Sequence, residues 1–158
     1  MAVYQYYKEQ KLPADITTVW DFISSPGNLK QITPEHMGFE ICSPYLPEKM
    51  YNGMIIIYRV SPLFRFRVTW VTEIVHIKGY EFFVDEQRSG PYKMWHHEHR
   101  IQSIDGGTLM TDIVTYKPPM GWLGALANRL FIAGKIRGIF DYREKMLHAI
   151  FGEYKQET

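Results

Sequence analysis

The sequence predicts an α+β fold in which a curved antiparallel sheet of six to seven strands wraps around one long C-terminal helix. Runs of β-branched and aromatic residues follow one another with short turns between them, which is typical of an antiparallel meander. Two short helical segments follow the first of these runs, and a proline-free stretch with helical spacing comes last. That stretch is the only large element available to cover the sheet. We expect residues 1–158 to form a single domain.

The first elements are a strand and two short helices. Tyr4 to Leu12 reads as a strand. Asp15 to Ser24 is expected to be helical, because Asp15 can cap the first turn and Pro26-Gly27 stops the run. The apolar residues of this helix share one face: Ile16, Val19, Trp20 and Ile23. A second short helix is expected from Asn28 to Ile32.

The middle of the chain consists of strand-like runs that lead into a β-hairpin. The runs extend from Phe39 to Ser43, Met54 to Val60, Phe64 to Ile77 and Tyr80 to Gln87. Gly90 to Lys117 then reads as a hairpin closed by Asp105-Gly106, the pair favoured in two-residue type I′ turns. In that register Ile104 pairs with Gly107, Ile101 faces Met110, His99 faces Asp112, His97 faces Val114 and Trp95 faces Tyr116. A three-residue loop would instead place Arg100 opposite Asp112, and the Asp-Gly pair favours the first register.

The last element is predicted to be one helix from Gly121 to Phe151, about 45 Å long at 1.5 Å per residue. Its expected core-facing residues are Leu123, Ala127, Leu130, Gly134, Ile139, Leu147 and Ile150. A bend is expected near Gly134 or Gly138. The initial segment GWLGALANRLF has the composition of a membrane-surface helix. We expect it to face the core instead, because Arg129 interrupts a short apolar run.

Composition excludes several classes of function. Eighteen basic and seventeen acidic residues nearly balance, so nothing favours a nucleic acid partner. Cys42 is the only cysteine, which excludes an internal disulfide, and we treat it as inert. Neither a signal peptide nor a membrane-spanning segment is apparent, so a soluble cytoplasmic protein without integral membrane association is expected. Glycine-rich phosphate loops, Cys-x-x-Cys pairs and Gly-x-Ser-x-Gly elbows do not occur, so no cofactor is expected.

The hairpin carries more polar groups than a hairpin needs. Residues that alternate along a strand share a face, so Trp95, His97 and His99 form one set, and Asp112 and Tyr116 belong to another. Such a face suits the wall of a pocket. A buried carboxylate requires a partner. We expect His99 to be the partner of Asp112, and Gln87 or a backbone amide to be that of Asp85. Trp95 and Tyr116 are expected to touch a ligand before Trp70, and His96 is expected to face solvent.

Three uses of these polar groups remain open. His97, His99 and Asp112 have the chemistry of a metal site. The same groups are suited to orienting a ligand in a polar patch, or to forming an acid–base dyad. A basic cluster around Ser61-Pro62, consisting of Arg59, Arg65 and Arg67, reads as a solvated face or as a contact for an anionic headgroup.

Four segments carry a resemblance that spans nearly the whole chain: VWDFISSPGNLKQITP, FVDEQRSGPYKMWHHEH, GGTLMTDIVTYKPP, and LGALANRLF followed by IFDYR. They resemble the SRPBCC superfamily of START-like proteins with a helix-grip fold, and within it a bacterial subgroup often labelled cell-division inhibitor. The resemblance implies a hydrophobic cavity between sheet and helix. The positions that match the motif are Phe83, Asp85, Gln87, Gly90, Pro91, Trp95, His97, His99, Asp112 and Tyr116.

Three functions follow as expectations. The leading one is non-catalytic binding of a small hydrophobic or amphipathic molecule in that cavity. Its expected contacts are Phe83, Asp85, Gln87, Trp95, His97, His99, Asp112 and Tyr116. The alternative is an enzyme of the polyketide cyclase or dehydratase type that uses His97, His99 and Asp112 as acid–base groups. The third is a protein–protein regulator that can form a homodimer, which would expose a large apolar patch.

Overall fold

Seven antiparallel strands form one sheet in the computed structural model, which describes residues 2–61 and 66–155. The strand order within the described part is β1-β7-β6-β5-β4-β3-β2. The strands are β1 (Tyr4–Leu12), β2 (Glu40–Ile41), β3 (Met54–Val60), β4 (Val68–Lys78), β5 (Phe82–Ser89), β6 (Met94–Ile104) and β7 (Gly107–Lys117). The predicted α+β class and antiparallel sheet are confirmed, although β2 is shorter than the run from Phe39 to Ser43. The predicted start of the next strand at Phe64 lies outside the described residues, and Phe66 and Arg67 precede β4.

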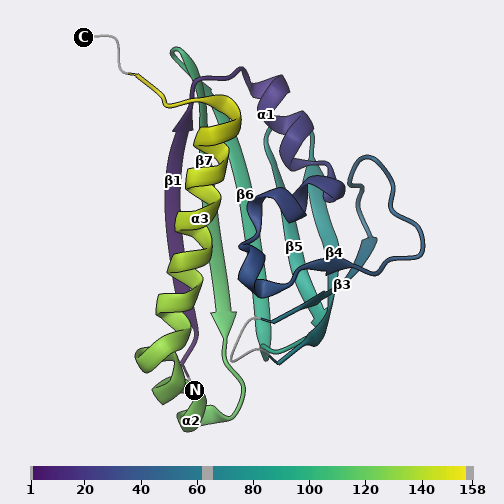
Figure 1. The fold of residues 1–158 in the computed structure, drawn as a ribbon, viewed down its shortest axis with the longest axis vertical. Helices are drawn as coiled ribbons and strands as arrows, with labels where there is room; N and C mark the ends of the chain where they lie inside the picture. The colour runs from purple at the N-terminus through teal and green to yellow at the C-terminus, as the bar shows by residue number, and fades with distance from the viewer. Residues whose placement is uncertain (1, 62–65, 156–158) are drawn as a thin grey trace.

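The helices lie on one face of this sheet (Figure 1). They are α1 (Ile16–Ile23), the 3₁₀ helices η1 (Pro26–Ile32) and η2 (Glu35–Met37), and the long C-terminal helix formed by α2 (Gly121–Ala127), the π-helix η3 (Asn128–Ile132) and α3 (Ala133–Phe151). Figure 1 shows α3 along β1 and β7, whereas η1 and η2 cover the other part of the same face and α1 contacts β6 and β7. The sheet therefore grips α3, as predicted. No helix within residues 2–61 and 66–155 is long and apolar enough to cross a membrane.

The first helix forms as its sequence predicts. The Asp15 side chain accepts a hydrogen bond from the Thr18 backbone N–H (2.9 Å), which satisfies one of the free amides of the first turn. Val19, Trp20 and Ile23 are buried and belong to the same hydrophobic cluster as residues of the sheet. The second helix begins at Pro26, two residues earlier than predicted, because proline is tolerated at the first helical position.

The hairpin adopts the register that Asp105-Gly106 predicts. Ile104 pairs with Gly107, as the two-residue loop predicts, and Gly106 has the left-handed conformation (φ +70°). Asp105 does not have a positive φ, so the turn is not of type I′, the type that the Asp-Gly pair favours. His99 lies opposite Asp112, whereas Arg100 pairs with Thr111, so the slipped register is wrong. This register puts His97 and His99 on the buried face of β6.

The buried face of the long helix differs from the predicted one. Its buried residues are Gly124, Asn128, Ile132, Ile136, Phe140 and Leu147, whereas Leu123, Leu130, Gly134 and Ile150 are exposed. At its start, an added Cβ on Gly124 would lie 1.9 Å from the Pro119 carbonyl oxygen, so only glycine fits. Asn128 is buried because its Oδ1 accepts a hydrogen bond from the Tyr116 hydroxyl (2.8 Å). Of the predicted set, Leu147 is buried and Ala127 and Ile139 pack against the core, so the prediction was wrong for Leu123, Leu130, Gly134 and Ile150.

Two further expectations for this helix hold only in part or differ from the structure. The irregularity is the π-helix at Asn128–Ile132, whereas Gly134 and Gly138 lie in the regular helix α3. The segment GWLGALANRLF faces the core with one side only, where Gly124 and Asn128 are buried. Its other side is exposed and carries Trp122, Leu123, Leu126 and Leu130.

Candidate functional site

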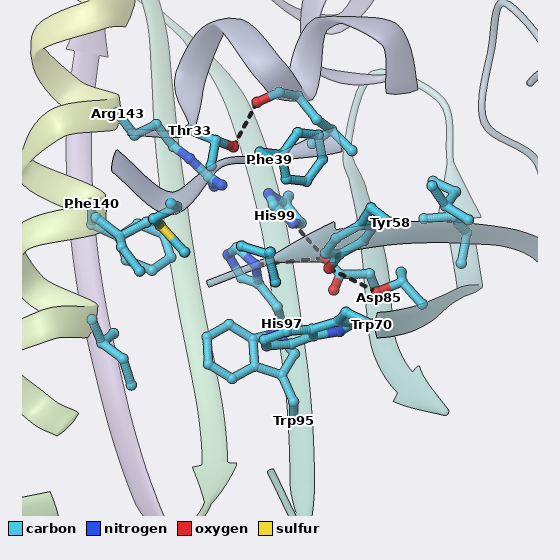
Figure 2. Close-up of a pocket in the computed structure, with 18 of the residues that line it drawn as sticks. Thr33, Phe39, Tyr58, Trp70, Asp85, Trp95, His97, His99, Phe140 and Arg143 are labelled. Carbon is cyan, nitrogen blue, oxygen red and sulfur yellow. Dashed lines mark hydrogen bonds and ion pairs between the residues drawn. The ribbon is translucent and has the colours of Figure 1, made fainter. Parts of the chain in front are cut away.

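A cavity of about 130 Å³ lies between the sheet, η1, η2 and α3, and it is partly open to solvent. Its walls are mainly apolar and aromatic and include Met37, Phe39, Ile56, Tyr58, Val60, Trp70, Phe83, Trp95, Ile136, Ile139 and Phe140. Three polar side chains, Asp85, His97 and His99, form one part of the wall. Figure 2 shows these three together in the middle of the site, with Trp70 and Trp95 to one side.

Asp85, His97, His99 and Asp112, here called the His–Asp cluster, come from the neighbouring strands β5, β6 and β7. The two short contacts join His97 Nε2 to Asp112 Oδ1 (2.8 Å) and His99 Nε2 to Asp85 Oδ2 (2.8 Å). The other ring nitrogens complete the arrangement, with His99 Nδ1 3.2 Å from Asp112 Oδ1 and His97 Nδ1 3.5 Å from Asp85 Oδ2. Each imidazole therefore lies between two carboxylates, and Phe83 stacks on the His99 ring at 4.1 Å.

Burial and pairing set the charges of the His–Asp cluster. Burial, together with the charge of His99, lowers the pKa of His97 to about 4. Burial also opposes the charged form of His99, but hydrogen bonds to Asp112 and Asp85 outweigh it and raise the pKa of His99. In both carboxyls burial is likewise outweighed by hydrogen bonds from the histidines, which lower the pKa of Asp85 and Asp112. These shifts favour the neutral form of His97 and the charged form of His99 between the two carboxylates.

Arg143 completes the site from α3, and the sequence analysis missed it. Its Nη1 lies 3.4 Å from Asp112 Oδ1, and its guanidinium lies over the Phe140 ring at 4.9 Å. Figure 2 shows the guanidinium pointing from the helix toward the histidines. Helical spacing contained a signal, because Arg143 follows Ile136 by seven residues and Ile139 by four, and so shares their face. With Arg143 and the His99 cation, the charges of Asp85 and Asp112 are balanced.

Five of the eight predicted contact residues line the cavity: Phe83, Asp85, Trp95, His97 and His99. Asp112 and Tyr116 do not, because both belong to β7, which lies beneath α3. Asp112 hydrogen-bonds to His97, and the Tyr116 hydroxyl donates to Asn128. Trp70 lines the cavity and Tyr116 does not, so the expectation that Tyr116 would touch a ligand before Trp70 is wrong.

Gln87 has a structural role that the sequence analysis did not predict. Its side-chain amide accepts from the Tyr92 backbone N–H (3.1 Å) and donates to the Tyr92 carbonyl oxygen (2.6 Å), which closes the turn around Gly90 and Pro91. Gln87 is therefore neither a cavity residue nor the partner of Asp85. The partner of Asp85 is His99.

The donor types near the cavity also bear on metal binding. Single ligand atoms of Asp85, His97 and His99 lie within 4.8 Å of one another, so Asp85 replaces Asp112 in the ligand set expected from the sequence. Two imidazoles and a carboxylate suit zinc or iron. However, the same atoms already bond to one another, and a divalent ion in place of the His99 proton would leave a net positive charge beside Arg143.

The remaining polar expectations concern the surface. Arg67 pairs with Glu40 (2.8 Å) and Arg59 is exposed, whereas Arg65 lies outside the described residues. His96 points away from the cavity, as predicted, and is half-buried with its Nδ1 2.8 Å from Glu86 Oε1. None of these described side chains belongs to the cavity wall.

Neither a protein-family model nor a curated protein matches the chain. Solved structures do. The KanY protein is 12% identical, with 96% of this chain and 99% of that chain covered and a TM-score of 0.72. Ara h 8.0201 is 13% identical, with 94% and 99% covered and a TM-score of 0.58. The chain has the helix-grip fold.

A third structure differs in length. A nucleoside-diphosphate sugar epimerase from Corynebacterium glutamicum is 22% identical over 90% of this chain, with a TM-score of 0.65. The matched region makes up only 28% of the epimerase. At these identities the similarity concerns the fold, and a fold does not by itself specify a function.

Proposed function

We propose that the protein binds one small, largely apolar molecule that carries a hydrogen-bond-accepting oxygen, in the cavity beneath α3, without converting it. The observation that carries this proposal is the pair of buried N–H groups without a partner on residues of the cavity wall, Trp70 Nε1 and Arg143 Nε. A buried donor without an acceptor costs about 1–3 kcal/mol. Both N–H groups are closed to water in the free protein, so a ligand oxygen would remove that cost once neighbouring side chains move to admit it.

The size and lining of the cavity define the rest of the ligand. A volume of about 130 Å³ is close to the roughly 150 Å³ of an apolar cavity known to hold benzene in another protein. A single ring or a short chain therefore fits inside, and a longer molecule would enter by one end. The apolar walls would contribute roughly 25 cal/mol per Å² of ligand surface that they bury.

Binding without conversion is favoured over acid–base catalysis by the state of the histidines. A general base works best with a pKa near the working pH. The pKa of His97 is lowered to about 4, so this imidazole is a weak base. His99 is held between two carboxylates at 2.8 and 3.2 Å, so its protons are already engaged.

Three single-ring probes test the proposal: phenylacetamide, phenylacetate and ethylbenzene. Calorimetry and thermal shift should show tighter binding of the two probes that carry oxygen, by about tenfold or more, which corresponds to about 1.4 kcal/mol. Arg143→Met should reduce that preference while ethylbenzene still binds. Trp70→Phe, which removes only the second donor, should reduce it as well.

Arg137→Met is the matched control, because Arg137 is exposed on the same helix and does not line the cavity. It should bind all three probes as the wild type does. Failure of every probe to bind, or a preference for oxygen that survives both Arg143→Met and Trp70→Phe, would contradict the proposal.

A further inference from the structure

Five large apolar side chains are exposed together where the long helix begins. They are Met120, Trp122, Leu123, Leu126 and Leu130, here called the α2 surface, and between 42% and 75% of each is exposed. The last four follow one another at intervals of one to four residues along α2 and η3, so they gather on one side of the helix. Figure 1 shows α2 at one end of the molecule, near the N-terminus. Exposed apolar patches of this kind often mark a binding surface.

The chain segment that carries the α2 surface has charges of one sign only. Residues 113–140 contain no aspartate or glutamate, but they contain Lys117, Arg129, Lys135 and Arg137. The whole chain has a formal net charge of only +1, so this segment concentrates positive charge locally. Arg129, which is exposed, lies between Leu126 and Leu130. Its long side chain can lie along apolar surface while the guanidinium reaches a negatively charged group.

We propose that the α2 surface binds the surface of an anionic lipid bilayer, with the helix lying in the interface. Tryptophan and leucine on one face with flanking arginine and lysine suit the boundary between acyl chains and headgroups. Each basic residue near an anionic membrane adds about 1 kcal/mol of attraction, or about fivefold in binding.

The α2 surface and the cavity are parts of one helix. Ile136, which lines the cavity, follows Leu130 by six residues, or about 9 Å of helix. Contact with a bilayer at the α2 surface would therefore bring the cavity close to the lipid phase. This inference does not depend on what the cavity binds.

Vesicle sedimentation tests the inference. The wild-type protein should sediment with phosphatidylcholine vesicles that contain phosphatidylglycerol, and less with phosphatidylcholine alone or at high salt. Trp122→Ser combined with Leu126→Ser should weaken sedimentation at least about tenfold, because both side chains would leave the acyl region. Arg129→Gln should weaken it about fivefold, and only with the anionic vesicles.

Tyr45→Ser is the matched apolar control, because Tyr45 is 76% exposed and lies far along the chain from α2. It should sediment as the wild type does. Wild-type protein that stays in solution with both vesicles would overturn the inference, as would a double variant that still sediments fully. The inference also fails if light scattering shows a dimer that the double variant abolishes and neither vesicle binds.

Discussion

His97 and His99 are two residues apart on β6, yet their surroundings shift their pKa values in opposite directions. The pKa of His97 is lowered, so its contribution to stability is present above the ordinary value of 6.5 and is lost as pH falls toward about 4. The pKa of His99 is raised, so its contribution is present below 6.5 and is lost as pH rises through the higher value. The charged groups that face both rings are Asp85, Asp112 and Arg143.

We therefore expect the free energy of unfolding to be highest near pH 6.5, the point where the two effects meet. His97→Gln should flatten the acidic side of the profile, where the shift of His97 corresponds to roughly 3 kcal/mol. His99→Gln should flatten the alkaline side. It should also lessen the slope on the acidic side, because the charge of His99 contributes to the lowered pKa of His97. Urea unfolding across pH measures both variants. If His99→Gln leaves the alkaline side unchanged, or if His97→Gln flattens the alkaline side, the assignment of the neutral and the charged imidazole is wrong.

At the scale of elements, the π-helix η3 is tied to the sheet by one buried hydrogen bond. The Tyr116 hydroxyl of β7 donates to Asn128 Oδ1 at 2.8 Å, and both residues are buried. The irregular turn at Asn128–Ile132 lies between the exposed α2 and the cavity-lining α3. This bond therefore holds η3 at the point where the long helix passes from the exposed α2 to the cavity-lining α3.

Tyr116→Phe should lower the free energy of unfolding by about 1–3 kcal/mol, because it leaves the buried Asn128 oxygen without a donor. Urea unfolding measures this loss of stability. Tyr7→Phe is the control, since Tyr7 is exposed and its hydroxyl donates to Glu9 at the surface, and it should change stability by less than about 0.5 kcal/mol. Tyr116→Phe with Asn128→Leu should cost less than the two single changes added together. If the double variant loses as much stability as the two single variants added together, the bond does not stabilise the helix.

Local signals predicted most of these elements, and distant contacts account for what they missed. Asp105-Gly106 fixes the hairpin register within a few residues, so His99 opposite Asp112 was predictable. The partner of Asp85 depends instead on how β5 pairs with β6, where Asp85 lies opposite His97. No short turn of known type sets that register. The burial of Gly124 and Arg143 depends on the rotation of the helix against Pro119 and the sheet, which the apolar pattern alone does not reveal.

At the scale of the whole molecule, the core is divided around a hollow. One buried cluster joins α1, η1 and the middle strands, and another joins β7 to α3 around Val114 and Ile136. The cavity lies where the clusters meet, with Ile136 in its wall. A cavity reduces packing, so a protein that does not need one gains stability by filling it.

Val60→Ile and Val114→Ile make the same change in two places and should have opposite effects. Val60 lines the cavity, so the added methylene should stabilise the protein by up to about 0.8 kcal/mol and weaken phenylacetamide binding. Val114 is fully buried away from the cavity, so the same methylene should overpack the core and cost about 1–3 kcal/mol. Thermal unfolding with and without phenylacetamide measures both effects. If Val60→Ile destabilises the protein as much as Val114→Ile, no space for a ligand exists beneath α3.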